Sequence, residues 1–216
     1  KYIDGKPMSE TELSLSDEER VCRDSGIATA KMHNIRAPKF GRPMAVKDGG
    51  GFSLWSEALS HELAEWRSIG IPSELFAGEE LCEIERLFKR AAPVLDEVRE
   101  PRLVHTDLWQ GNILLRPEAG RPAFAAIIDA DRAIWGDPAF EFSSIQWTYG
   151  KESFWEGYGR ALSADFASLV RRDIYTLLNR LWNAYVYQCE YNRPADALRE
   201  REDARRCAAQ LRSMLG

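Results

Sequence analysis

A carboxylate, an amide and a second carboxylate follow one another in the middle of this chain. Asp107 is followed five residues later by Asn112, and Asp129 comes directly after an apolar run that ends at Ile128. Carboxylate and amide oxygens suit Mg²⁺, which takes its remaining ligands from water and phosphates. A carboxylate that is not a ligand can accept a proton from an attacking hydroxyl. These residue types together indicate metal-assisted phosphoryl transfer, which needs little beyond positioning and charge compensation.

Two short strands must bring these side chains together. The branched residues of 112–115 and 124–128 predict strands, and the Gly-Arg-Pro segment 120–122 between them predicts a turn. In an antiparallel pair, the start of one strand lies beside the end of the other. Asn112 would open the first strand, Asp129 would close the second, and Asp107 would lie on the loop before them. We therefore expect the three side chains to converge at one edge of a hairpin.

The rest of the chain has mainly helical periodicity. Ser16 and Glu19 have the spacing of a capping box, which predicts a helix from there to about residue 34. Further helices are predicted over 54–69, 79–98, 138–149, 164–190 and 194–215. Asp137 is the expected N-cap of the helix that begins at Pro138. Residues 36–53 hold two prolines and a run of three glycines, and predict a surface loop.

The composition limits the kinds of partner. The 29 basic and 34 acidic residues give a net charge of −5, which argues against nucleic acid and anionic membranes as partners. No apolar run approaches the roughly 18 residues that a membrane-spanning helix needs. The four cysteines lack metal-binding spacing and are typical of reduced thiols. We expect a cytoplasmic protein that binds a small molecule, and the sequence leaves its oligomeric state open.

The motifs in the middle of the chain resemble those of the aminoglycoside phosphotransferase and choline-kinase-like superfamily. In order and at matching distances the chain has His105-x-Asp107-x-x-x-x-Asn112, Ile128-Asp129 and Gly136-Asp137-Pro138. The strict motifs cover residues 103–142. The resemblance implies an α+β, mainly α-helical fold. That fold is the C-terminal lobe of a protein-kinase-like enzyme, with a small β-hairpin carrying the catalytic and metal-binding loops.

The resemblance also implies roles for individual residues. It makes Asp107 the catalytic base, and it makes Asn112 and Asp129 the magnesium ligands within the ATP site. His105 looks like the histidine that orders the catalytic loop. The segment that contains Asp137 and Glu141 would brace that loop, and the role of Asp131 stays open.

The first seven residues, Lys-Tyr-Ile-Asp-Gly-Lys-Pro, are similar to the hinge between the two lobes of this family. The resemblance implies that residues 1–8 are a hinge remnant and that the backbone of Ile3 lies near the adenine. Residues 9–216 would form the helical catalytic and substrate-binding lobe. The nucleotide-binding lobe would precede Lys1, so we expect these 216 residues alone to be inactive.

Three residues depart from the family pattern. Thr106 stands where glycine is usual, Ala130 where an aromatic residue is usual, and Glu141 where aspartate is usual. The first departure predicts altered backbone angles in the catalytic loop, and the last leaves the geometry of the brace open.

Three functions are compatible with the sequence. The first is ATP-dependent phosphorylation of a hydroxyl group on a small cationic molecule, either an aminoglycoside-like antibiotic, with antibiotic resistance as the consequence, or a metabolite. The second is a non-catalytic substrate-binding or partner-binding module derived from the same fold. The third is a metal-dependent hydrolase that uses Asp107, Asp129 and Asp131, although such sites usually recruit more ligands.

Other residues that could do chemistry have simpler interpretations. His33 and His61 are predicted to lie at the surface or at helix ends. A cluster of aromatic residues could line a substrate pocket by stacking or cation–π contact but is more typical of a core. Its members are Trp147, Tyr149, Phe154, Trp155 and Tyr158.

Overall fold

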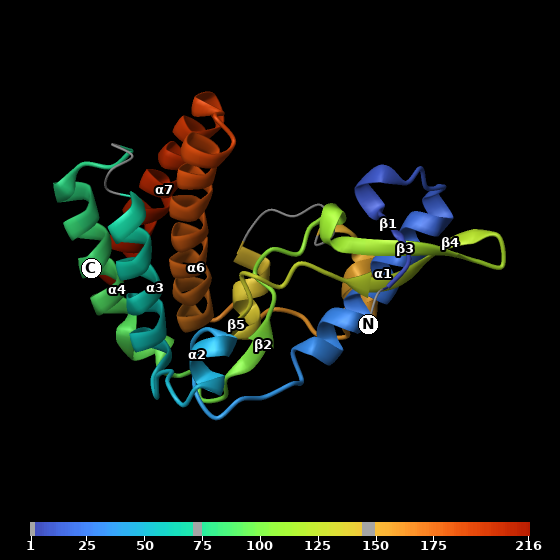
Figure 1. The fold of residues 1–216 in the computed structure, drawn as a ribbon. Coiled ribbons are helices and arrows are strands. Elements are labelled where there is room, and N and C mark those ends of the chain that lie inside the picture. Colours follow the sequence, from blue (N-terminus) through green and yellow to red (C-terminus); the bar gives the residue numbers. More distant parts are fainter. Residues whose placement is uncertain (1–2, 71–74, 144–149) are drawn as a thin grey trace. The chain divides into compact units, whose positions relative to one another are not determined.

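The computed structural model describes residues 3–70, 75–143 and 150–216 (Figure 1). The chain divides into two compact units. Unit 1 consists of Lys1–Pro38 and Glu100–Leu162, and unit 2 of Lys39–Arg99 and Ser163–Gly216. Within the described ranges, no helix is long and apolar enough to cross a membrane.

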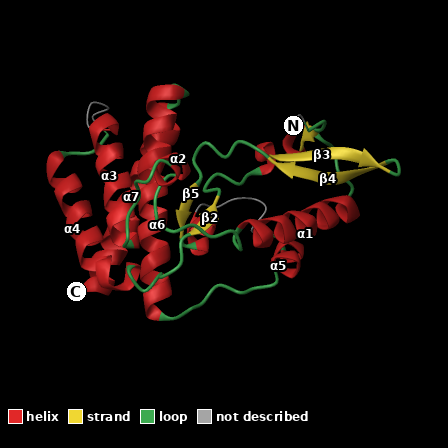
Figure 2. Ribbon diagram, turned by 60° about the horizontal axis from the view of Figure 1, so that its bottom comes forward, coloured by secondary structure: helices red, strands yellow, loops and turns green. Residues whose placement is uncertain are grey.

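Unit 1 is built around helix α1 (Leu15–Met32), which lies between a β-hairpin and helix α5 (Glu152–Tyr158) (Figure 2). The hairpin consists of β3 (Ile113–Glu118) and β4 (Arg121–Ile127), and β1 (Lys6–Pro7) pairs with β3 on its outer side. Apolar side chains from these elements form one buried cluster because each element turns one face inward. Its buried members are Met8, Val21, Cys22, Leu108, Ile113, Leu115, Phe154 and Tyr158.

The contact between α1 and α5 depends on two glycines. A Cβ atom at Gly26 would overlap the carbonyl oxygen of Phe154, and one at Gly157 would overlap the carbonyl oxygen of Arg23. The two helix backbones therefore approach closely, which glycine permits because it has no side chain. This approach holds α5 against the face of α1 that does not carry the hairpin.

The hairpin has the predicted antiparallel register, with Ile113 opposite Ile127. Its tip is a two-residue turn in which Ala119 has φ 49° and Gly120 has φ 77°. Such left-handed pairs match the twist of the flanking strands. A second pair, β2 (Arg102–Val104) with β5 (Ile134–Gly136), was not predicted from the sequence.

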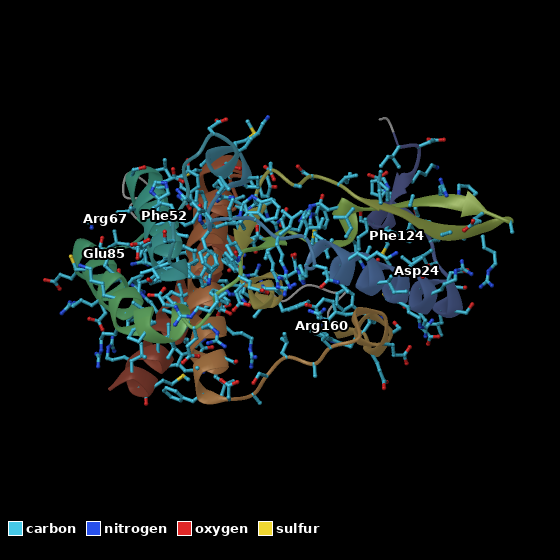
Figure 3. All side chains as sticks on the ribbon, turned by 90° about the horizontal axis from the view of Figure 1, so that it is seen from below. Asp24, Phe52, Arg67, Glu85, Phe124 and Arg160 are labelled. Atoms are coloured by element: carbon cyan, nitrogen blue, oxygen red, sulfur yellow. The ribbon has the colours of Figure 1, made fainter. Side chains whose placement is uncertain are left out.

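Unit 2 is a helical bundle of α3 (Trp55–Gly70), α4 (Gly78–Leu95), α6 (Phe166–Tyr185) and α7 (Pro194–Leu215) (Figure 1). Its core is fixed by two indole hydrogen bonds, from Trp55 Nε1 to the Tyr175 hydroxyl at 2.8 Å and from Trp66 Nε1 to the Leu181 carbonyl at 2.9 Å. Tyr and Trp polar groups usually find such partners when buried. Arg67 of α3 and Glu85 of α4, both labelled in Figure 3, form an ion pair between neighbouring helices.

The predicted helices of unit 2 are confirmed, with shifted ends. Helix α6 ends at Tyr185 and continues as a π-helical turn, Val186–Glu190. The prediction of a loop over 36–53 was wrong in part, because a short helix α2 (Pro43–Lys47) forms there and Phe40 pairs with Phe52. Pro43 begins α2, where its missing N–H costs nothing.

Two predictions at helix starts in unit 1 need correction. Helix α1 is capped by Ser14 rather than Ser16, since the Ser14 hydroxyl accepts a hydrogen bond from the backbone N–H of Asp17 at 3.2 Å. The helix predicted from Pro138 is a 3₁₀ helix, η4 (Pro138–Ser143), and residues 144–149 lie outside the described ranges. Asp137 does cap it, because its Oδ1 accepts from the N–H of Ala139 at 3.0 Å.

Candidate active site

Residues 105–112, predicted from the sequence to be the catalytic loop and called by that name below, connect β2 to β3 in unit 1. Leu108 in its middle is fully buried in the core of that unit and anchors the loop. A 3₁₀ turn, η3 (Gln110–Asn112), then leads into β3. The Asn112 amide Nδ2 donates to the Asp107 main-chain oxygen at 2.8 Å and to its carboxylate Oδ2 at 3.3 Å. The Asn112 side chain at the end of the loop thus binds both the backbone and the carboxylate of Asp107 near its start.

Asp129 lies at the same end of the hairpin as Asn112. The N–H of Ile128 donates to the carbonyl of Asn112 at 2.9 Å, and Asp129 is the next residue. Asp129 is exposed and has φ 63°, in the left-handed region that few residues other than glycine adopt. The chain therefore turns sharply at Asp129 after the strand. The end of β4 therefore lies beside Asn112, as the antiparallel pairing predicts, and the convergence of the three side chains stays a prediction.

His105 connects the catalytic loop to the end of β4. Its Nε2 lies 2.9 Å from the carbonyl oxygen of Ile128, and its Nδ1 lies 3.3 Å from the backbone N of Asp107. A carbonyl oxygen only accepts and a backbone N–H only donates, so the ring carries its proton on Nε2. The imidazole is thus an orienting group between Asp107 and the strand that precedes Asp129.

Thr106 occupies the left-handed region with φ 67°. Glycine adopts this region freely, whereas other residues pay for it. Thr106 therefore keeps a left-handed conformation at the cost of strain, and the predicted change of the loop's backbone angles stays a prediction. Three contacts hold the residue in place: its hydroxyl donates to the Arg132 carbonyl at 2.8 Å, and its N–H and that of His105 donate to Glu141 at 3.0 and 2.8 Å.

The carboxylate of Asp107 is partly buried and sits near one cation. Burial raises its pKa, and the proximity of Asp131 adds to this, whereas Arg132, His105 and the Asn112 amide oppose the rise. The Arg132 guanidinium Nη1 lies 3.8 Å from Asp107 Oδ1. A carboxylate with a raised pKa is a better proton acceptor than an ordinary surface aspartate.

The oxygen donors at this edge suit a hard cation. Because the Asn112 Nδ2 faces Asp107, its Oδ1 is the end of the amide left for a ligand. Asp129 is exposed and follows Ile128, whose N–H is bonded to the Asn112 carbonyl, so its carboxylate is at the same end of the hairpin. One amide and one carboxylate leave most positions for water and phosphate, as magnesium requires. In the described ranges, no three His, Cys, Asp or Glu side chains gather as a metal site.

The contacts of His33 beside the catalytic loop were not predicted from the sequence. His33 ends α1, which is one of its two predicted positions, but it is fully buried and does not lie at the surface; His61 is exposed, as predicted. Tyr158 and Phe154 are also buried in the core of unit 1, whereas Trp147 and Tyr149 lie outside the described ranges. The His33 partners lie more than 100 positions further along the chain, at Glu141 and Tyr158. No local pattern could have revealed them.

A mainly helical chain with an Asp–Asn loop and a following aspartate on a hairpin is the C-terminal lobe of a protein-kinase-like fold. Residues 1–174 match the family model APH, described as the phosphotransferase enzyme family. The chain belongs to this family. Among the curated proteins compared with it, none matches the chain.

Solved structures share this fold at low sequence identity. One is a thermostable mutant of the aminoglycoside phosphotransferase APH(4)-Ia in a ternary complex with AMP-PNP and hygromycin B, at 18% identity and a TM-score of 0.61, covering 97% of this chain and 71% of that one. Another is a proposed fructosamine-3-kinase from Haemophilus somnus, at 17% identity and a TM-score of 0.67, covering 98% of this chain and 66% of that one. A third is the streptomycin–ATP complex of APH(2")-IIa, at 18% identity and a TM-score of 0.56, covering 94% of this chain and 68% of that one.

Proposed function

We propose that this chain is the catalytic and substrate-binding part of an ATP-dependent phosphotransferase that acts on a hydroxyl group of a small molecule. The observation that carries the proposal is the hydrogen-bonded pair of Asp107 and Asn112 at the end of the hairpin, next to Asp129. Family membership and the ATP and AMP-PNP complexes of the similar structures support ATP as the phosphoryl donor.

Asp107 is the proposed catalytic base. Its carboxylate is held by a hydrogen bond from Asn112, and its Oδ1 lies close enough to Arg132 for an electrostatic interaction with the guanidinium. It would accept the proton of the substrate hydroxyl as that oxygen attacks the γ-phosphoryl group. Its raised pKa favours this transfer.

Asn112 Oδ1 and the Asp129 carboxylate are the proposed magnesium ligands. Magnesium, when bound there, would offset negative charge on the phosphates of ATP. The contribution of the chain is to orient the ligands: the amide of Asn112 is fixed by Asp107, and the carbonyl of Asn112 is paired with Ile128. The backbone of Ile3, in the segment that resembles the hinge, is the proposed contact to the adenine.

The substrate is proposed to be a small cationic molecule, either an aminoglycoside-like antibiotic or a metabolite. The protein is proposed to act in the cytoplasm. Asp131, two residues after the proposed magnesium ligand Asp129, is exposed and close enough to Asp107 to raise its pKa. Acidic side chains at a site of this kind attract ammonium groups over distances comparable to the Debye length. The similar structures with hygromycin B and streptomycin are consistent with such a substrate.

The decisive test is Asp107→Asn in the complete protein. The substitution keeps the size of the side chain and removes the base, so ATP-dependent transfer to an acceptor panel of aminoglycosides and amino sugars should fall by about 10²-fold or more. Asp24→Asn on α1 is the matched control and should keep wild-type turnover. Unchanged turnover in Asp107→Asn would remove Asp107 from the mechanism.

A further inference from the structure

His33 ends helix α1 and is buried with both ring nitrogens in polar contact. Its Nε2 lies 3.3 Å from Glu141 Oε2, and its Nδ1 lies 2.9 Å from the Tyr158 hydroxyl. Neither the His33 nor the Glu141 side chain has any exposed surface. A buried polar group is costly unless it is paired, so these contacts fix the ring.

Glu141 passes this constraint on to the catalytic loop. Its Oε2 accepts from the N–H of His105 at 2.8 Å and its Oε1 from the N–H of Thr106 at 3.0 Å. Both N–H groups immediately precede Asp107, whose own N–H donates to His105 Nδ1 at 3.3 Å. The hydrogen bonds thus run without a break from Tyr158 on α5 to the backbone of Asp107.

We infer that His33 is a positioning residue for phosphoryl transfer, acting through Glu141 on the backbone at His105 and Thr106. The inference rests on the proposed function. His33 touches neither the reacting atoms nor the proposed metal ligands. Its effect is to keep the Glu141 carboxylate turned so that both oxygens receive a loop N–H, which fixes where Asp107 stands.

Three properties of the network favour a positioning role over simple core filling. Thr106 is held at φ 67°, a strained conformation that persists only where surrounding contacts enforce it. Glu141 is one atom longer than the aspartate usual in the family, so it has an additional rotatable bond to be fixed. The carboxylate of Glu141 is also fully buried, and although burial opposes its ionisation, the hydrogen bond and charge of His33, followed by His105, lower its pKa.

The test compares His33→Leu with His33→Gln in the complete protein. Leucine fills the space and cannot donate to Glu141, whereas the glutamine amide keeps one donor for it. A displacement of catalytic groups by about 1 Å can lower the rate by about 10²-fold. We therefore expect His33→Leu to lower kcat by about 10- to 100-fold, with the KM values for ATP and for the acceptor within about threefold of the wild type. His33→Gln should recover most of kcat.

Amide hydrogen exchange gives a readout that does not require turnover. The N–H groups of His105 and Thr106 should exchange at least about tenfold faster in His33→Leu than in the wild type, because local opening becomes easier. They should stay near the wild-type rate in His33→Gln. The control is Val170→Ala, since Val170 is buried in α6 of unit 2. It should lower Tm and leave kcat and the exchange rates of both amides unchanged.

The outcomes separate the two proposals. Equal kcat in His33→Leu and the wild type, equal losses in both His33 variants, or unchanged exchange at residues 105 and 106 would each overturn the positioning role. If the wild type transfers no phosphoryl group to any acceptor, the proposed function fails, and the exchange comparison still decides whether His33 holds the loop.

Discussion

Asn112 and Asp107 are joined by two hydrogen bonds from a single amide nitrogen, one to the backbone oxygen and one to the carboxylate of the aspartate. The side chain of Asn112 is buried, so its amide has little freedom to turn. The same contact therefore orients the proposed base and turns the other end of the amide, Oδ1, towards the place where a cation would sit. A single structural feature thus positions both the proposed base and the proposed metal ligand.

Substitutions at Asn112 should separate these two roles. Asn112→Asp keeps an oxygen ligand but removes the donor and places a second carboxylate against Asp107. Asn112→Ala removes both ligand and donor. Both should lower kcat by about 10²-fold, since removing groups that orient a site typically costs 10- to 100-fold. Only Asn112→Ala should need more Mg²⁺ for half-maximal rate, as measured by magnesium titration of turnover. A wild-type kcat in Asn112→Asp would show that the contact with Asp107 is dispensable.

The hairpin, and the pairing of its strand ends near Asn112, could be predicted from the sequence because these features are local. The branched residues of 112–115 and 124–128, the Gly-Arg-Pro turn region and the order Asp107, Asn112, Asp129 all lie within a short stretch. The roles of these residues stay predictions, as does the place of Ile3 near the adenine. The structure adds how the loop is held, namely by Leu108 in the core and by hydrogen bonds to His105 and Thr106.

What the sequence could not predict depends on long-range contacts. The β2–β5 pair has strands of three residues, which are too short for a periodicity signal. His33 was predicted to lie at the surface or at a helix end, and it does end α1, but residues of α5 and η4 more than 100 positions away in the chain cover it. Burial of this kind follows from tertiary packing and has no local signature.

The strain at Thr106 is open to measurement by two substitutions. Thr106→Ala and Thr106→Gly both lose the hydroxyl that donates to the Arg132 carbonyl, so the comparison isolates the backbone. Alanine keeps the penalty of φ 67° and glycine removes it. Thr106→Gly should be more stable than Thr106→Ala by about 1 kcal/mol, measured by urea unfolding. An alanine variant as stable as the glycine variant would mean that the left-handed conformation is not kept in solution.

The close approach of α1 and α5 predicts strong effects of very small changes. Gly26→Ala and Gly157→Ala each place a methyl group against a carbonyl oxygen of the other helix. Each should lower the free energy of unfolding by about 1–3 kcal/mol or more, as overpacking does. Gly78→Ala at the start of α4 is the matched control, because a Cβ there meets nothing within 4 Å. It should leave stability unchanged or slightly higher in thermal unfolding.

The buried Glu141 predicts how stability changes with acid. Its pKa in the folded protein is lowered because the hydrogen bond and charge of His33 and the contacts with His105 outweigh the effect of burial. A carboxyl group whose folded pKa is depressed contributes stability above its unfolded pKa and loses it as the pH falls through the folded value. The stability difference between wild type and Glu141→Gln should thus be largest near neutral pH and shrink below about pH 4.5, the ordinary value for glutamate.

Glu62 in unit 2 is a suitable control, because its pKa is shifted in the opposite direction to that of Glu141. It is paired with Arg42, yet burial raises its pKa. A raised folded pKa means that the folded state binds the proton more tightly, so the wild type gains stability relative to Glu62→Gln as the pH falls. Urea unfolding of the wild type and both variants at pH 7 and pH 4 gives the two differences. From pH 7 to pH 4, the free energy of unfolding of the wild type should fall relative to that of Glu141→Gln and rise relative to that of Glu62→Gln. A Glu141→Gln difference that is constant with pH would mean that this carboxyl group is not held as the anion by His33.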